Sequence, residues 1–248
     1  MDELEKSVTK KTKMIIINNP NNPIGKVFTR SELEKLADFS SRHNLLVIAD
    51  EVYETLVFED SCSPMVKFAS LPEMWRRTIT IGSLGKMLGV TGWKIGWIIC
   101  PSELARPFWL VHQFVPFSVC TPLQEAAAVA ISHTMETGFI EETSSKYMQL
   151  RDILIKTLVE CGLNPCKSDG GYFVVADASR LVGKTNGVEL AKFLTEHAGV
   201  TSIPMSAFYQ AKESHCVDKY LRFAFCKDEG TLKNAGARLK AYFKVQTD

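Results

Sequence analysis

The stretch Leu45-Leu-Val-Ile-Ala49 is apolar at every position and is followed directly by Asp50-Glu51. Met14–Ile17 is a second run of the same kind, and Thr78–Ile81 is a third, β-branched run. A short run that is apolar throughout is typical of a parallel strand with both faces covered by helices. We therefore expect these runs to be buried neighbouring strands of one sheet.

A helix is predicted between the first two runs. Thr29-Arg-Ser-Glu32 matches a capping box, in which the Thr hydroxyl and the Glu carboxylate bond the first amides of a helix. Leu33, Leu36 and Ala37 then share one helical face, and His43-Asn44 is expected to end the helix. The strand–helix–strand order predicts an α/β fold with a mostly parallel sheet and flanking helices.

The second half of the sequence has a different pattern, with a long polar-faced helix expected from about Gly138 to Glu160. We place a boundary inside this helix, which gives a first domain over residues 1–145 and a smaller α+β domain over residues 146–248. The remaining predicted strands are Trp97–Cys100, Tyr172–Ala176, Val200–Ile203 and Tyr220–Ala224, and the remaining helices cover Val188–His197 and Thr231–Phe243.

Composition excludes several classes of function. The chain has 248 residues and a formal charge of +1, from 29 Lys+Arg and 28 Asp+Glu, which argues against binding nucleic acid. It has no apolar stretch long enough to cross a membrane, and its polar N-terminus does not resemble a secretory signal. Seven cysteines without a C-x-x-C pair and five scattered histidines predict free thiols, a cytoplasmic location and no metal site.

Polar residues follow each predicted strand, at the end where open α/β sheets bind ligands. These residues are Asn22, Asp50, Tyr53, Ser83 and Lys86. Far along the chain, Arg222 lies in the otherwise apolar strand Tyr220–Phe225. An acid, an amide, a phenol, an amine and a guanidinium together predict a site that handles charged small molecules.

Gly82–Lys86 invites two other hypotheses. A phosphate-binding P-loop is excluded, because Thr80 and Met87 occupy the positions that need Gly and Ser or Thr. Ser83-Leu-Gly-Lys86 matches S-x-x-K, in which Ser is a nucleophile assisted by Lys, although the S-D-N companion motif is missing from the sequence. A serine acylase is therefore a lesser alternative.

Four motifs in order resemble the fold-type I, class I/II aminotransferases, which depend on pyridoxal 5′-phosphate. They are Asn18-x-Pro-x-Asn-Pro-x-Gly25, Ala49-Asp-Glu-Val-Tyr53, Ser83-x-Gly-Lys86 and Thr91-Gly-Trp-Lys-Ile-Gly-Trp97. Asp50–Glu54, Thr121–Gln124, Gly170–Phe173 and Tyr220–Phe223 are most similar to kynurenine aminotransferases, a branch also called glutamine transaminase K and cysteine-S-conjugate β-lyase. The resemblance covers nearly the whole chain.

The resemblance implies that the chain is the C-terminal part of the cofactor-binding large domain followed by the small domain. Familiar members begin upstream of Met1, so the first strands, a phosphate-binding helix start and a ring-stacking aromatic are expected to be missing. The implied activity is transamination between an aromatic or sulfur-containing amino acid, such as kynurenine or glutamine, and a 2-oxo acid such as 2-oxoglutarate. A homodimer, or a heterodimer with a full-length homologue, is implied, and a mitochondrial location is known in the family. The alternative is a non-catalytic remnant that binds a full-length subunit.

The resemblance also implies roles around the cofactor ring. Lys86 would be the Schiff-base lysine and, once released, the base that moves the substrate's α-proton. Asp50 would pair with the ring nitrogen and keep it protonated. Tyr53 and Asn22 would bind the ring's 3-oxygen, and Asn22 would also contact the substrate.

Three further residues are implied to bind anions. Ser83 and Lys94 would bind the cofactor phosphate, and Arg222 would hold the substrate carboxylate in a two-pronged contact that a lysine could not reproduce.

Each residue also has a purely structural interpretation. Asp50 could cap a helix, Asn22 could form a turn and Tyr53 could be a core residue. Lys94 could extend over the surface, and Arg222 could pair with an acid in the small domain. Packing roles are expected for Trp93, Trp97, Tyr172 and Phe173.

Overall fold

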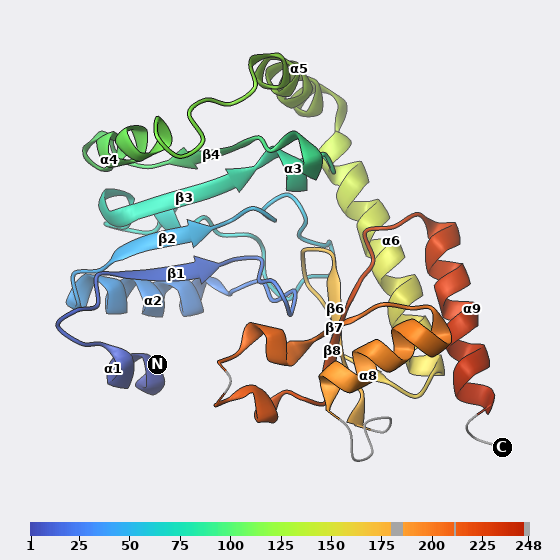
Figure 1. The fold of residues 1–248 in the computed structure, drawn as a ribbon. Coiled ribbons are helices and arrows are strands. Elements are labelled where there is room, and N and C mark those ends of the chain that lie inside the picture. The colour runs from blue at the N-terminus through green and yellow to red at the C-terminus, as the bar shows by residue number, and fades with distance from the viewer. Residues whose placement is uncertain (180–185, 211, 246–248) are drawn as a thin grey trace. The chain divides into compact units, whose positions relative to one another are not determined.

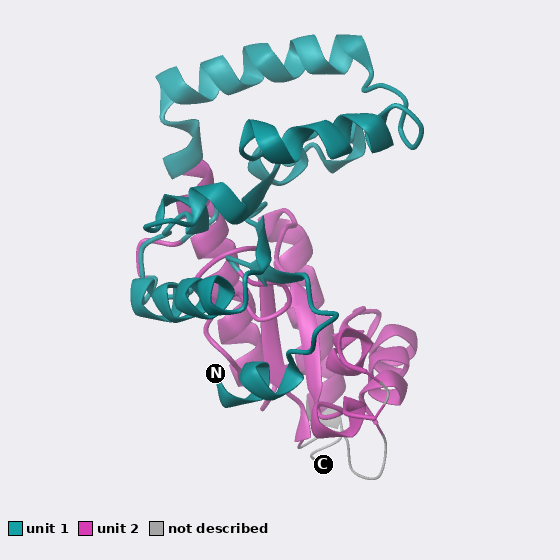
Figure 2. Cartoon of the chain, turned by 90° about the vertical axis from the view of Figure 1, so that its left-hand side faces the viewer, with its two compact units in different colours: residues 1–20, 27–57, 61–141 teal, residues 21–26, 58–60, 142–248 magenta. Residues whose placement is uncertain are grey.

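The computed structural model describes residues 1–179, 186–210 and 212–245, and its chain divides into two compact units. Figure 2 colours unit 1 teal and unit 2 magenta. Unit 1 comprises Met1–Pro20, Val27–Val57 and Ser61–Glu141, and unit 2 comprises Asn21–Lys26, Phe58–Asp60 and Glu142–Asp248. Two short segments of the first half therefore belong to unit 2. The functional domain boundary at residues 145/146 stays a prediction.

Unit 1 is built on a four-stranded sheet with the order β1-β2-β3-β4 (Figure 1). The first three strands are parallel and β4 is antiparallel to β3, so the predicted α/β class is confirmed. The strands are β1 (Met14–Asn18), β2 (Leu46–Asp50), β3 (Thr78–Ser83) and β4 (Gly96–Ile99). The helices are α1 (Asp2–Ser7), α2 (Arg30–Arg42), α3 (Leu84–Met87), α4 (Ser102–His112) and α5 (Thr121–Thr137), with 3₁₀ turns η1 (Phe68–Ser70), η2 (Trp75–Arg77) and η3 (Thr91–Trp93).

One face of this sheet packs against α2. Val47 and Ala49 of β2 are fully buried and belong to one apolar cluster with Leu33 of α2. The expected burial of β1 on both faces is wrong for the chain described, since Met14 and Ile16 are 48% and 67% exposed. The reason is the pleat, which points alternate side chains to opposite faces, whereas α2 covers one of them.

Unit 2 contains a second sheet, with the order β5-β6-β8-β7 and antiparallel pairing throughout. Its strands are β5 (Asn164–Pro165), β6 (Phe173–Asp177), β7 (Ile203–Pro204) and β8 (Tyr220–Ala224). Its helices are α8 (Gly187–Phe193), the π-helical turn η4 (Leu194–Ala198) and α9 (Glu229–Val245), with 3₁₀ turns η5 (Met205–Phe208) and η6 (Ser214–Cys216). The long helix α6 (Phe139–Glu160) begins in unit 1 and continues in unit 2.

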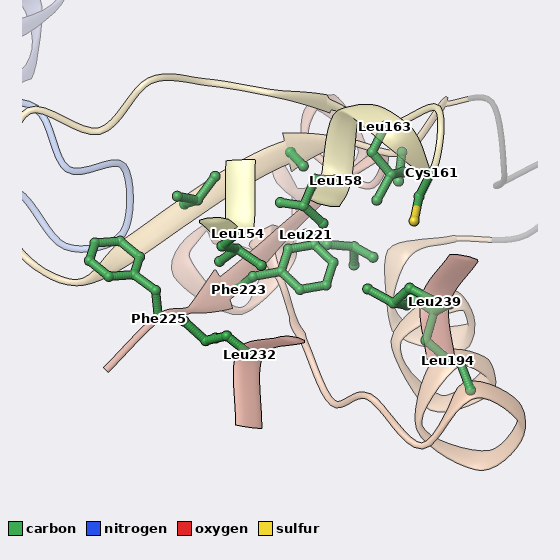
Figure 3. Close-up of a cluster of buried hydrophobic side chains, with 14 of the residues drawn as sticks. Leu154, Leu158, Cys161, Leu163, Leu194, Leu221, Phe223, Phe225, Leu232 and Leu239 are labelled. Atoms are coloured by element: carbon green, nitrogen blue, oxygen red, sulfur yellow. The ribbon is translucent and has the colours of Figure 1, made fainter. Parts of the chain in front are cut away.

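The core of unit 2 joins this sheet to α6, α8 and α9. Figure 3 shows Leu158, Leu194 and Leu221, all fully buried, among the side chains of the cluster. The predicted strand Val200–Ile203 is wrong except at its last residue. The reason is that the backbone N–H of Val200 donates to the carbonyl of Leu194 at 3.2 Å and completes the preceding helical turn.

All seven cysteines are free. Within the described ranges, no helix is both long and apolar enough to traverse a lipid bilayer.

The start of α2 has the capping box that its sequence predicts. The backbone N–H of Glu32 donates to Thr29 Oγ1 at 3.2 Å, and the backbone N–H of Thr29 donates to Glu32 Oε2 at 2.9 Å. We expect Thr29→Ala to lower the free energy of unfolding of unit 1 by about 1 kcal/mol, because one of the helix's first amides loses its acceptor. Urea unfolding followed by circular dichroism measures the change. Thr29→Ser keeps the hydroxyl and is expected to be nearly neutral; an equal loss in both variants would contradict this explanation.

Candidate active site

Asp50 is the last residue of β2, in the parallel part of the sheet. It pairs in register with Asn18 of β1 and Ile81 of β3. Its backbone carbonyl accepts hydrogen bonds from Asn18 Nδ2 and from the backbone N–H of Asn19, each at 3.0 Å. The backbone of Asp50 is therefore fixed by its neighbours, which limits the directions that its side chain can take.

The Asp50 carboxylate is half-buried and only partly satisfied. Its Oδ1 atom is buried and has no hydrogen-bond partner among the described residues. Burial raises the pKa of Asp50 above its ordinary value, although a hydrogen bond from the backbone N–H of Val52 and the positive charge of Lys86 oppose that rise. A buried acceptor without a donor costs about 1–3 kcal/mol. This is the situation expected where a ligand supplies the missing donor.

Lys86 lies in the short helix α3, directly after β3. Gly85 allows close packing here, because a Cβ atom at residue 85 would lie 2.8 Å from the Cα atom of Thr91. Lys86 Nζ is 5.9 Å from the centre of the Tyr53 ring, which is only 4% exposed. Since the charge of Lys86 also acts on Asp50, the acid, the phenol and the amine form one cluster within unit 1.

Ser83 and Lys94 lie at the same end of the sheet as this cluster. Ser83 is the last residue of β3 and pairs with Gly96 of β4, which Lys94 precedes by two residues. Lys94 has a left-handed backbone with φ of 58° where η3 ends, and it is exposed. Because β4 runs antiparallel to β3, both residues are near the carboxyl end of β3. A hydroxyl and an ammonium group at this position are suited to bind a phosphate.

Unit 2 holds the other two predicted residues in direct contact. Arg222 Nη1 donates to Asn22 Oδ1 at 2.6 Å, across 200 positions of sequence. The Arg222 guanidinium lies 3.9 Å from the centre of the Phe173 ring and 4.9 Å from that of Phe208. The amide and the two rings restrict the orientation of the guanidinium, whose planar fork of N–H groups matches the geometry of a carboxylate.

The structure thus gathers the seven predicted residues into two groups, and their roles stay predictions. Asp50, Tyr53, Ser83, Lys86 and Lys94 belong to unit 1, whereas Asn22 and Arg222 belong to unit 2. Phe173 was expected to have a packing role, and no motif in the sequence points to Phe208. The position of Phe208 depends on the pairing of Ile203 with Arg222, and no local motif reveals that register.

The chemistry of these groups fits pyridoxal phosphate, the cofactor that the resemblance implies. The buried Oδ1 of Asp50 needs a donor, which a protonated pyridine nitrogen would supply. An amine and a phenol are close to it, and donors suited to a phosphate lie at the same sheet end. Asp50, Tyr53, Ser83, Lys86 and Lys94 are the residues of unit 1 that would hold the cofactor.

Comparison with known proteins gives relatives that extend over most of this chain. The kynurenine–oxoglutarate transaminase of Dictyostelium discoideum is 42% identical over 94% of this chain and 57% of its own length. The kynurenine–oxoglutarate transaminase 3 of Mus musculus is 40% identical over 97% of this chain and 55% of its own length. The chain therefore spans a little more than half the length of these curated relatives.

Solved structures agree with the sequence relatives. Bna3p from Saccharomyces cerevisiae superposes with a TM-score of 0.91 and 36% identity, over 98% of this chain and 60% of its own. The N-succinyldiaminopimelate aminotransferase of Mycobacterium tuberculosis gives a TM-score of 0.89 and 38% identity, over 97% of this chain and 61% of its own. A sequence model of the class I and II aminotransferases matches residues 1–239. The chain belongs to the class I and II aminotransferase family.

Proposed function

We propose that this chain binds pyridoxal phosphate and takes part in transamination between an amino acid and a 2-oxo acid. The observation that carries the proposal is the buried, unsatisfied Oδ1 atom of Asp50 beside the positive charge of Lys86. Membership of the aminotransferase family supports the proposal, since an acid beside a lysine is by itself a weak indication of a functional site. The chain spans 57% of the length of its Dictyostelium relative. The proposed activity is therefore argued from residues that this chain contains.

The proposed substrates are aromatic or sulfur-containing amino acids, with 2-oxoglutarate as the acceptor. Support comes from the names of the relatives, which are kynurenine–oxoglutarate transaminases. Structural likeness alone is less selective, because an N-succinyldiaminopimelate aminotransferase superposes almost as closely as Bna3p. The free cysteines fit a reducing compartment, and we propose the cytoplasm.

Two residues would hold the cofactor ring, which when bound supplies an electron sink for the substrate's α-carbon. Asp50 would accept a hydrogen bond from the ring nitrogen through Oδ1 and keep that nitrogen protonated. Tyr53 would donate its phenol proton to the ring's 3-oxygen. Both side chains are held by β2 and the turn that follows it, so they would orient the ring with little loss of conformational entropy.

Lys86 would act on the substrate as a general base. Its Nζ atom would accept the proton from the substrate's α-carbon and deliver it to the C4′ carbon of the cofactor. Tyr53 confines Nζ from one side, which favours a single position for proton transfer.

Three residues would bind the charged ends of the ligands. Ser83 Oγ and Lys94 Nζ would hold the cofactor phosphate near the carboxyl end of β3. Arg222 would bind the substrate carboxylate with two parallel hydrogen bonds, and Asn22 orients it for this task. Asn22 is also proposed to contact the substrate and the ring's 3-oxygen.

The alternatives raised by the sequence are not favoured. A non-catalytic remnant was suggested by the expected loss of N-terminal strands, whereas the relatives that match this chain are named as transaminases. A serine acylase would use Ser83 as the nucleophile, but the chain belongs to the class I and II aminotransferase family, and we propose cofactor-binding roles for Ser83 and Lys86.

We propose that the enzyme is a dimer in solution, with a second copy covering the apolar surface of α4, α5 and the segment between them. Several large side chains of this part of unit 1 are strongly exposed: Trp109 71%, Phe114 84%, Val115 78%, Phe117 80% and Met135 84%. A cavity of about 580 Å³ between β4 and α4 is lined by apolar residues of the same region. Many strongly exposed apolar side chains in one region are typical of protein interfaces.

Lys86→Ala is expected to abolish covalent attachment of the cofactor. Wild-type chain incubated with pyridoxal phosphate and then reduced with borohydride should carry a pyridoxyl group on the peptide that contains Lys86, detected by mass spectrometry. Lys35→Ala, on the exposed side of α2, is the matched control and should label like the wild type. Equal labelling of Lys86→Ala would overturn the assignment of Lys86.

Asp50→Asn is expected to stabilise the cofactor-free chain and weaken cofactor binding. Removing a buried, underpaired charge should raise the free energy of unfolding by about 1 kcal/mol at pH 8. Burial raises the pKa of Asp50 above 3.8, so the penalty is fully present above the folded-state pKa and disappears as the pH falls below the unfolded value. Urea unfolding at pH 8 and at a pH below 3.8 measures the gain in stability and its loss, with Glu125→Gln as an exposed control. A titration with pyridoxal phosphate at pH 8 measures the cofactor affinity. A destabilised Asp50→Asn variant would contradict this account.

Phe114→Ser combined with Phe117→Ser is expected to convert a dimer to a monomer. The two exposed rings would lose most of the apolar area that they contribute to an interface. Light scattering after size-exclusion chromatography measures the mass, with Trp75→Ser, at a lone exposed ring elsewhere in unit 1, as the control. A wild-type chain that is monomeric at all concentrations would remove this part of the proposal.

A further inference from the structure

Arg151 of α6 is a buried charged residue outside the candidate active site. It is 2% exposed, and its Nη1 and Nη2 atoms donate to the two carboxylate oxygens of Asp60, each at 2.9 Å. Its Nη1 atom also donates to the carbonyl of Ser168 at 2.9 Å, and its Nε atom to Asp152 at 2.8 Å. The guanidinium lies 4.8 Å from the centre of the Phe58 ring. Arg151 therefore ties the segment Phe58–Asp60 and the turn at Ser168 to α6, all within unit 2.

The turn Ser168–Gly170, which Arg151 contacts, is hydrogen-bonded to the loop of residues 21–26 that carries Asn22. The carbonyl of Gly25 accepts hydrogen bonds from the backbone N–H groups of Asp169 at 2.9 Å and Gly170 at 3.0 Å. Ser168 Oγ donates to the carbonyl of Gly170 at 2.8 Å, and Ser168 is fully buried. Phe58 is bonded to the same turn, because its backbone N–H donates to the carbonyl of Asp169 at 3.0 Å.

Gly25 shows how closely the loop of residues 21–26 packs against the turn Ser168–Gly170. Its φ is +70°, and a Cβ atom there would lie 2.0 Å from Ser168 Oγ and 2.9 Å from the carbonyl oxygen of Gly170. Within the loop, the backbone N–H of Gly25 donates to Asn21 and that of Asn21 to Lys26, each at 2.8 Å. The loop of residues 21–26 is therefore closed by its own hydrogen bonds and is bonded to the turn at Gly25. A displacement of Ser168–Gly170 is expected to move the whole loop.

The contacts of Asp60 support a geometric role for this cluster. Arg151 and Lys167 hold the pKa of Asp60 at about 2, so its charge persists at any ordinary pH. An ion pair with one buried partner adds little net stability, because desolvation of that partner offsets the attraction, whereas the rigid fork of arginine fixes the positions of its acceptors. The arrangement is thus better suited to holding two backbone segments in place than to stabilising the unit.

We propose that Arg151 is a positioning residue for carboxylate recognition, acting through Ser168 and Gly25 on Asn22, which orients Arg222. The inference rests on the proposed function, since it assigns to Arg222 the substrate carboxylate. Loosening the Arg151–Asp60 pair lets the Asn22 loop shift, and the guanidinium of Arg222 loses its fixed orientation. Small displacements of positioning groups have large effects on binding and rate.

The test uses the full chain loaded with pyridoxal phosphate and two variants, Asp60→Asn and Arg151→Lys. Asp60 is 43% exposed at its side chain, so Asp60→Asn keeps the shape with little risk to folding. We expect both variants to raise the Kd for 2-oxoglutarate about tenfold, measured by calorimetry, with unchanged cofactor absorbance. Hydrogen exchange of the amides in residues 21–26 should become faster. Glu160→Gln, which breaks an exposed ion pair of the same helix with Lys240, should change neither quantity, and Arg222→Lys should raise the Kd.

The outcomes separate this inference from the proposed function. A tenfold higher Kd together with faster exchange in residues 21–26 supports the positioning role. An unchanged Kd in both variants, or a higher Kd without faster exchange in the loop, overturns it while leaving the proposed function intact. A wild-type chain that binds no 2-oxoglutarate would contradict the proposed function itself, and the role of Arg151 would fall with it.

Discussion

Parallel hydrogen bonding between β1, β2 and β3 places the ends of three strands at one edge of the sheet. The register aligns Asn18 with Asp50 and Asp50 with Ile81, so side chains from distant parts of the sequence begin their loops side by side. β4 runs in the opposite direction and starts at this same edge, which brings Lys94 there as well. Every candidate residue of unit 1 owes its position to this pairing, and a slip of one residue would reverse the face of each.

Two neighbouring acids at this end of the sheet, Asp50 and Glu51, are both at least half-buried but have different surroundings. Burial raises the pKa of both Asp50 and Glu51. Glu51 accepts the backbone N–H of Phe68 at 2.8 Å and lies 3.3 Å from Lys67 Nζ, in ion-pair range although without a well-directed hydrogen bond to it. Its partners belong to a structural loop, which gives Glu51 an anchoring role. Both acids keep a buried oxygen without a hydrogen-bond partner among the described residues, Oδ1 of Asp50 and Oε2 of Glu51. Because the ion pair with Lys67 compensates the Glu51 oxygen, Asp50 is the acid for which we propose a ligand.

The elements that short-range interactions determine could be predicted from the sequence. The capping box at Thr29, the helix end at His43 and the strand that ends at Asp50 all follow from short-range hydrogen bonding and periodicity. The helix α4 was not predicted, because Pro107 in its middle normally indicates a helix break. The exposure of Ile16 depends on which face the rest of the chain covers, and no pattern within the strand contains that information. Residues such as Phe208 and Arg151 depend on long-range register and were missed for the same reason.

The partner of Arg222 illustrates how much chemistry such a long-range contact decides. Sequence alone allowed an acid at this position, and an acid would neutralise the guanidinium and compete with any incoming carboxylate. The contact found in unit 2 is with the amide oxygen of Asn22, which accepts a hydrogen bond but carries no charge. This hydrogen bond orients Arg222 without neutralising its charge, and the same holds for the contacts with the two aromatic rings beside it. An orienting partner without charge suits the carboxylate-binding role proposed for Arg222, and Asn22 is such a partner.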